Sequence, residues 1–330
     1  MEETNLKSKL PAELYDLLQK VEIDDPQDLI LKSNAELQGL APFSSKDIKL
    51  LKKVAAEIIL CKKRFLTGLE MHMNTSYHIR RLKIGCPLMD NILNGGLICK
   101  GVSEISGESG TGKTQICLQL SIIVQYSEEQ GGLNAGAIYI CTEDVFPSKR
   151  LQQLFTTFPP AFQYRYRFKS NFTTNFSDNI YIEHASDAET LVQIICKDVP
   201  LLMANRKIGL VVIDSIAAVF RIEAVSPKRS NMMRAIGSTL HKLANDYGAV
   251  VICINQVSSN INTGMMMPCL GLSWANLTTT KIQLLHNWDN PSISHNEKSS
   301  LRTFSILSAP HLPPNSVTYK VDEAGISSAM

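Results

Sequence analysis

Eight consecutive residues, Gly107–Thr114, fill every fixed position of the phosphate-binding pattern G-x-x-x-x-G-K-[ST]. The glycines allow successive backbone N–H groups to turn toward phosphate oxygens. Lys113 is placed to reach the β- and γ-phosphates, and the Thr114 hydroxyl is a ligand for Mg²⁺. The pattern therefore predicts a site for ATP with Mg²⁺. The predicted contacts in this segment are Gly107, Glu108, Ser109, Gly110, Thr111, Gly112, Lys113, Thr114 and Gln115.

A carboxylate ends the apolar run at residues 210–214, Leu-Val-Val-Ile-Asp. In phosphoryl-transfer chemistry such a carboxylate holds Mg²⁺ together with the hydroxyl of the phosphate-binding loop. We therefore predict that Asp214 and Thr114 form the metal site. A second interpretation stays open, in which Asp214 only caps a helix after the strand, although Ser215 is able to serve as that cap.

Two further apolar runs end in polar side chains suited to hydrolysis. Residues 137–143 end in Glu143, and residues 250–256 end in Gln256. Ligands of open α/β sheets bind at the carboxyl ends of strands, so we expect both side chains near the phosphates. With Lys113 they form the predicted catalytic set, in which Glu143 polarises the attacking water and Gln256 senses the γ-phosphate. The alternatives are a surface acid for Glu143 and a strand-end cap for Gln256.

The elements that position these residues belong to a predicted core over residues 82–330, where short apolar runs alternate with amphipathic segments. This alternation predicts an α/β fold with a doubly wound, mostly parallel sheet and helices on both faces. Three later runs, joined by Asn/Pro/Ser-rich turns, predict an antiparallel extension of the sheet. The predicted strands cover residues 101–106, 137–141, 180–183, 209–213, 249–254, 279–285, 301–307 and 316–321, and the predicted helices include 190–204 and 231–247.

Residues 1–65 predict a separate, small all-helical domain. A helix is expected over residues 11–20, and Asp25 and Ser33 each begin a helix with an acid three residues later. A longer helix opens at Ser44 or Ser45, and its lysines form either a solvated face or a weak contact surface for a DNA backbone. Residues 66–81 are polar and without a clear period, which predicts a linker.

The composition excludes several classes of protein. Of the 330 residues 44% are apolar, and 33 basic against 31 acidic residues leave a net charge of +2, so any nucleic-acid contact must be local. The eight cysteines form no C-x-x-C pair, which argues against a zinc site or a disulfide framework. No apolar run approaches the roughly 18 residues of a membrane span, and the polar start is not a secretory signal. We expect a soluble protein of the cytosol or nucleus.

The order of these motifs resembles the RecA/RadA family of recombinases, which includes the eukaryotic strand-exchange proteins. The resemblance rests on the phosphate loop, on residues 139–143, on Asp214-Ser215 and on residues 255–257, and it covers nearly the whole chain. Residues 149–154, 274–276 and 307–314 narrow it to the recombinase paralogues. It implies a RecA-type ATPase core and slow, DNA-stimulated hydrolysis of ATP.

The resemblance also implies roles and partners. Arg150 would stack on the adenine base, and residues 309–314 would cap the nucleotide of a neighbouring protomer. The partners would be another recombinase paralogue, the strand-exchange recombinase, and single-stranded or branched DNA that the chain alone binds weakly. A nuclear location, with a cytoplasmic pool, fits these roles.

One departure concerns the two loops that bind DNA in filament-forming members of the family. The first region, residues 222–231, keeps Lys228 and Arg229, but the second, residues 257–270, holds Met265–Met267 and no lysine or arginine. A loop without a cation lacks the phosphate contacts that dominate affinity for DNA, and methionines are adaptable apolar contacts. We therefore expect weak DNA binding and no unaided strand exchange.

A second departure concerns a tether between protomers. Residues 65–68, Phe-Leu-Thr-Gly, fall where the family places F-x-x-A, whose phenylalanine plugs a pocket on the adjacent core. Glycine in place of alanine removes one methyl group, about 0.8 kcal/mol of burial, so we expect a weakened plug. In the other interpretation Phe65 only completes the apolar face of the preceding helix.

Three functions are compatible with these residues. The first is an ATP-dependent assembly factor in homologous recombination that pairs with another paralogue and supports the strand-exchange recombinase. The second is an autonomous DNA-dependent ATPase or strand-exchange enzyme, against which the cation-free second loop argues. The third is an ATP-locked structural module with negligible hydrolysis, and the presence of Glu143 favours slow turnover over it.

Overall fold

In the computed structural model the chain forms two compact units, Met1–His78 and Ile79–Met330. The structure describes residues 6–21, 23, 25–61, 67–73, 79–168, 175–221, 226–259, 266–287 and 301–329. Among the helices of these residues, none is both long and apolar enough to cross a membrane. The phosphate-binding motif lies within the second unit.

The first unit is helical in its described part. Fully buried leucines at positions 18, 29, 37 and 51 form the centre of its core. Because each comes from a different helix, this small core holds those four helices together. The helices are α1 (Leu6–Lys9), α2 (Ala12–Lys20), α3 (Pro26–Leu31), α4 (Asn34–Leu40), α5 (Ser45–Cys61) and α6 (Gly68–Met73).

Two of these helices begin at capping boxes, and the sequence predicts the one at Ser33, while at Ser44 it predicts only the start of a helix. The Ser33 hydroxyl accepts a hydrogen bond from the N–H of Glu36 at 3.2 Å, and the Glu36 carboxylate accepts one from the N–H of Ser33 at 2.6 Å. Ser44 and Asp47 repeat the arrangement before α5. Helix α6 lies inside the predicted linker, where no helix is predicted. Its Leu69 is 71% exposed, so no buried face marks the helix in the sequence.

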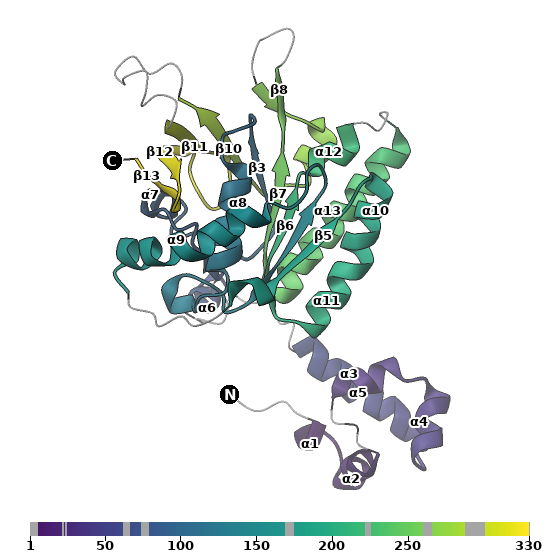
Figure 1. The fold of residues 1–330 in the computed structure, drawn as a ribbon. Helices are drawn as coiled ribbons and strands as arrows, with labels where there is room; N and C mark the ends of the chain where they lie inside the picture. Colours follow the sequence, from purple (N-terminus) through teal and green to yellow (C-terminus); the bar gives the residue numbers. More distant parts are fainter. Residues whose placement is uncertain are drawn as a thin grey trace. The chain divides into compact units, whose positions relative to one another are not determined.

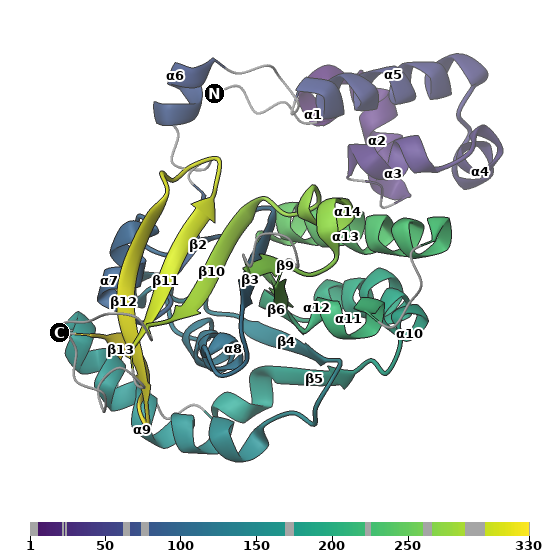
Figure 2. The same cartoon turned by 90° about the horizontal axis from the view of Figure 1, so that it is seen from above.

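The second unit is built on a nine-stranded sheet with the order β13-β12-β11-β10-β3-β7-β6-β4-β5 (Figures 1 and 2). The run from β10 to β5 is parallel, and β10 to β13 are antiparallel to one another, which confirms the predicted α/β class with its antiparallel C-terminal extension. The strands are β3 (Val102–Gly107), β4 (Gly136–Cys141), β5 (Ile180–His184), β6 (Ile208–Asp214), β7 (Val250–Asn255), β10 (Thr280–His286), β11 (Leu301–Ser308), β12 (Asn315–Asp322) and β13 (Gly325–Ser328).

The central strands are apolar along their whole length because both faces of the sheet are covered. In β6, Leu210 and Val212 belong to the cluster formed with α8 and α9, while Val211 and Ile213 belong to the cluster formed with α10 and α13 (Figure 1). The covering helices are α8 (Lys113–Ile123) and α9 (Ser148–Tyr166) on one face, and α10 (Ala188–Gln193), α11 (Val199–Asn205) and α13 (Pro227–Tyr247) on the other.

Shorter elements complete the unit. A π-helical turn over Ile194–Asp198 joins α10 to α11, so the predicted helix over residues 190–204 is one helical stretch with an irregular centre. Short strands also pair outside the main sheet, β1 with β2 and β8 with β9. These elements are β1 (Arg81–Leu82), α7 (Pro87–Ile92), β2 (Leu97–Ile98), α12 (Ile216–Arg221), β8 (Val257–Ser259), β9 (Met266–Pro268) and α14 (Gly271–Ala275), with 3-10 turns at Glu128–Gln130 and Phe176–Asn179.

Candidate nucleotide-binding site

The phosphate loop runs from the end of β3 to the start of α8, as its pattern requires. Gly112 is the residue before α8 and has a φ of +98°, a conformation that favours glycine. At Gly107 a Cβ atom would lie 2.5 Å from the carbonyl oxygen of Leu284 on the neighbouring strand. Both glycines therefore shape a loop whose backbone N–H groups stand before a helix N-terminus, where an anion is stabilised.

Lys113 folds over the loop that precedes it. Its Nζ donates hydrogen bonds of 2.7 Å to the carbonyls of Gly107 and Glu108. Burial lowers the pKa of the Lys113 ammonium, and the charges of Asp214 and Glu143 oppose that shift. A phosphate group in the same place would favour the charged form of this lysine further.

Asp214 is the last residue of β6 and lies beside the start of α8. One oxygen of its carboxylate accepts hydrogen bonds from two hydroxyl groups. Thr114 Oγ1 and Tyr139 OH each donate a hydrogen bond of 2.7 Å to Oδ2. Burial, followed by the charge of Asp214, raises the pKa of Tyr139 well above its ordinary value, so the phenol is a donor here. The hydroxyl of Thr114 and the carboxylate of Asp214 are hard oxygen ligands at one point, and this donor set fits Mg²⁺.

Glu143 and Gln256 meet at the carboxyl ends of β4 and β7. The amide Nε2 of Gln256 donates a hydrogen bond of 2.5 Å to Oε1 of Glu143. Arg221, the last residue of α12, donates to the amide oxygen of Gln256, and its second terminal nitrogen lies 3.7 Å from the same Glu143 oxygen. The two predicted residues are therefore together, joined by an arginine that sequence reasoning did not single out.

Arg150, on the first turn of α9, faces the phosphate loop from the opposite side. Its Nε donates a hydrogen bond of 2.7 Å to Oε1 of Gln115, and its terminal nitrogens donate to the carbonyls of Asp322 at 2.7 Å and Glu323 at 3.1 Å. Thr157 also donates to the Glu323 carbonyl, at 2.8 Å. The turn between β12 and β13 is thus tied to the helix that carries Arg150.

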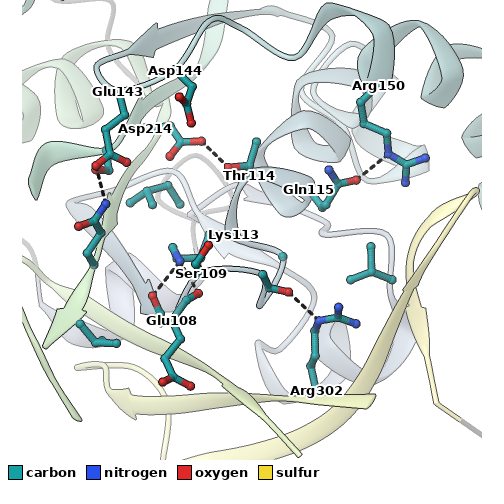
Figure 3. A pocket seen from close by; sticks show the side chains of 18 residues that line it. Glu108, Ser109, Lys113, Thr114, Gln115, Glu143, Asp144, Arg150, Asp214 and Arg302 are labelled. Atoms are coloured by element: carbon teal, nitrogen blue, oxygen red, sulfur yellow. Dashed lines mark hydrogen bonds between the residues drawn. The ribbon is translucent and has the colours of Figure 1, made fainter. Parts of the chain in front are cut away.

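These residues line one pocket of about 720 Å³ (Figure 3). It contains every predicted nucleotide contact except Thr111, which is fully buried and whose hydroxyl donates to the Glu108 carbonyl at 2.8 Å. The side chain of Thr111 therefore supports the loop from behind. The remaining predicted residues in the pocket are Gly107, Glu108, Ser109, Gly110, Gly112, Lys113, Thr114, Gln115, Glu143, Arg150, Asp214 and Gln256.

The pocket also contains residues that the sequence did not indicate. Arg302, on β11, donates a hydrogen bond of 3.0 Å from Nε to the Gly110 carbonyl (Figure 3). His286, at the end of β10, does not line the pocket but contacts its loop, with Nε2 3.0 Å from the Ser109 carbonyl oxygen. Val321 of β12 lines the pocket as well. Only the order of strands in the sheet brings these C-terminal residues to the loop, and no local motif marks them.

Other predicted residues lie away from the pocket. Lys228 forms a 2.5 Å ion pair with Glu189, and Nε of Arg229 donates to the Phe220 carbonyl at 3.1 Å. Residues 309–314 form the turn between β11 and β12, and none of them lines this chain's pocket. Phe65, Met265, residues 222–225 and residues 260–264 lie outside the described residues.

Comparison with known proteins shows which family this chain resembles. Residues 76–329 match the Rad51 family. The chain is 36% identical to "DNA repair protein XRCC3" of Mus musculus over 322 residues, covering 91% of this chain and 90% of the relative. It is 30% identical to "DNA repair protein rhp57" of Schizosaccharomyces pombe over 285 residues, covering 75% of this chain and 79% of that relative. These matches confirm the predicted resemblance to the recombinase paralogues of the RecA/RadA type, and the paralogue to which the chain is similar is DNA repair protein XRCC3.

Proposed function

This chain belongs to the Rad51 family, as a recombinase paralogue of DNA repair, and on that premise we propose that it is an ATP-dependent assembly factor in homologous recombination. It binds ATP with Mg²⁺, hydrolyses it slowly, pairs with another recombinase paralogue and supports the strand-exchange recombinase. In this role the chain takes part in the repair of DNA double-strand breaks and crosslinks, and it therefore acts in the nucleus.

The observation that carries this proposal is the meeting of three groups around Lys113. Thr114 Oγ1 donates a hydrogen bond to the carboxylate of Asp214. Glu143 lies across the same pocket, after the end of a different strand. Mg²⁺ held by Thr114 and Asp214 would neutralise charge on the β- and γ-phosphates. Lys113 would hold the same phosphates, and Glu143 would orient and accept a proton from the attacking water.

The edge of the sheet supports the proposed pairing with another paralogue. Strand β5 is last in the strand order, so its outer edge has no neighbouring strand among the described residues. Beside it lies a pocket of about 220 Å³ lined by Ile138, Ile182, Ile194, Val199 and Leu202, together with Tyr181, Glu183 and Asp198. An extended segment of a partner with one large apolar side chain fits such an edge and pocket.

Turnover and strand exchange test the central proposal. We expect slow ATP hydrolysis by the wild type and a large loss of kcat in Glu143→Gln, with the affinity for ATP kept. Equal rates in the two proteins would remove Glu143 as the base, and negligible hydrolysis by the wild type would favour an ATP-locked module. Joint molecules formed by the purified chain alone would instead favour an autonomous strand-exchange enzyme.

The partner interface has a separate test. Ile182→Glu places a charge at the β5 pocket and should abolish co-purification with the partner paralogue while ATP binding is kept. Tyr164→Glu is the matched control, because Tyr164 is 87% exposed on α9 and does not line that pocket. Phe65→Glu tests the tether in the same assay. Normal pairing by Ile182→Glu would contradict docking at β5.

A further inference from the structure

Arg221 closes a triangle of side chains at the edge of the nucleotide pocket. One terminal nitrogen donates to the amide oxygen of Gln256, the other lies 3.7 Å from Oε1 of Glu143, and Gln256 donates to that same oxygen at 2.5 Å. Glu143 follows β4 and Gln256 follows β7, while Arg221 ends the helix after β6. The triangle therefore joins the ends of three neighbouring strands.

These contacts involve both the oxygen and the nitrogen of the Gln256 side-chain amide. A guanidinium only donates hydrogen bonds, so the amide oxygen must face Arg221, and a carboxylate only accepts them, so the amide nitrogen must face Glu143. Nε2 of Gln256 carries two hydrogens, and the bond to Glu143 uses one of them and fixes the direction in which the amide points. Both bonds of the amide have a charged partner, which makes them stronger than neutral ones, so Arg221 and Glu143 together hold this orientation.

We propose that Arg221 is a positioning residue that keeps Glu143 and Gln256 bound to each other, and that a polynucleotide phosphate backbone releases them by binding its guanidinium. The inference rests on the proposed hydrolysis of ATP by the same pocket. Release would leave the Gln256 amide free to donate to the γ-phosphate and the Glu143 oxygen free to accept a proton from water.

The surroundings of Arg221 suit such an exchange. Its side chain is 59% exposed, and an exposed ion pair contributes little net stability, so a phosphate is able to compete for it. A planar guanidinium binds phosphate through two parallel hydrogen bonds. A hollow of about 460 Å³, lined by Arg221, Glu143, Thr142 and Ser186 among others, gives access from outside the nucleotide pocket.

The test compares steady-state ATP turnover of four proteins with and without a single-stranded oligodeoxynucleotide. Without DNA we expect Arg221→Gln to raise kcat several-fold at unchanged ATP affinity, a gain that a loss of structure would not produce. Arg221→Lys should lie between it and the wild type, because one ammonium cannot hold both partners. Arg206→Gln is the matched control, since Arg206 is exposed and precedes β6 at the other end of the strand. DNA should bring the wild type near the rate of Arg221→Gln and stimulate that variant little.

Two results would overturn this role of Arg221. The first is an Arg221→Gln protein that binds ATP normally but turns over no faster than the wild type. The second is an accelerated Arg221→Gln protein that DNA still stimulates to the full wild-type extent, which would exclude release by phosphate. Hydrolysis by Glu143→Gln at the wild-type rate, with and without DNA, would instead remove Glu143 as the base of the proposed hydrolysis, and the role of Arg221 with it.

Discussion

Tyr319 donates a hydrogen bond of 2.5 Å to the backbone carbonyl of Thr111, across 208 positions of the chain. Tyr319 lies on β12 and is fully buried, and Thr111 is the centre of the phosphate loop. On the same strand, Val321 would lie 3.2 Å from a Cβ atom at Gly112. The antiparallel extension therefore forms the wall against which the phosphate loop takes its shape.

Tyr319→Phe should weaken both the fold and the nucleotide site. The ring still fills its place, but the Thr111 carbonyl loses its partner in a buried position, which costs about 1–3 kcal/mol of the free energy of unfolding. The loop should then hold ATP less tightly. Urea unfolding and titration with ATP measure the two effects, and unchanged values in both would contradict the role given to this hydrogen bond.

Arg150→Ala tests the adenine contact separately from the phosphate contacts. If Arg150 stacks on the base, its loss should weaken ATP binding by about 2- to 30-fold, which corresponds to a cation–π contact of about 0.5–2 kcal/mol. Inorganic triphosphate has no base, so its affinity should not change. Calorimetry with ATP and with inorganic triphosphate measures the two affinities. An equal loss for the two would mean that Arg150 acts by tying Gln115 and the β12–β13 turn to α9.

How far the sequence predicts this molecule depends on the range of the contacts involved. Strand β6 is predictable because burial on both faces leaves an uninterrupted apolar run that ends at Asp214. Strand β13 is missed because its four residues, Gly325–Ser328, are too few to show a period. Thr111 is predicted as a contact by its place in the motif, yet its side chain is buried, because the motif constrains only some of its positions.

Such local patterns do not predict contacts between segments that are distant in the sequence. The phosphate loop predicts Lys113 and Thr114 by local spacing, but Tyr319 and Arg302 reach that loop only because β10 pairs with β3 and brings β11 and β12 after it. Arg221 ends a short helix and carries no motif of its own. Its relation to Glu143 follows from the neighbouring positions of β4, β6 and β7 in the sheet.

Thr114→Val should make ATP binding insensitive to Mg²⁺. Valine keeps the shape of the side chain but removes the hydroxyl that donates to Asp214 and would ligate the metal. A bond to a charged group is worth about 1.5–3 kcal/mol, so we expect a loss of about 10- to 100-fold in affinity for ATP with Mg²⁺. With EDTA present the two proteins should differ little. Thr114→Ser keeps the hydroxyl and serves as the control, and a Mg²⁺ response in the valine variant would contradict the metal assignment.

Glu104→Gln should stabilise the protein increasingly as the pH rises. Glu104 is 2% exposed on β3, and Asn255 Nδ2 donates to its Oε1 at 2.7 Å. Burial raises the pKa of Glu104 above its ordinary value of 4.5. Between pH 4.5 and the folded-state pKa, the unfolded chain has released a proton that the folded chain still holds. The free energy of unfolding therefore falls as the pH rises through that window.

Glutamine at position 104 carries no such proton, so its advantage over the wild type should be larger at about pH 8 than at about pH 5. Its amide nitrogen also supplies a donor near Asn255 Oδ1, a buried oxygen that has no hydrogen-bond partner among the described residues. Urea unfolding at both pH values measures the difference. Glu129→Gln is the control, because it makes the same replacement at an exposed position. If the stability difference between Glu104→Gln and the wild type did not grow with pH, Glu104 would be as easily ionised in the folded protein as in the unfolded chain.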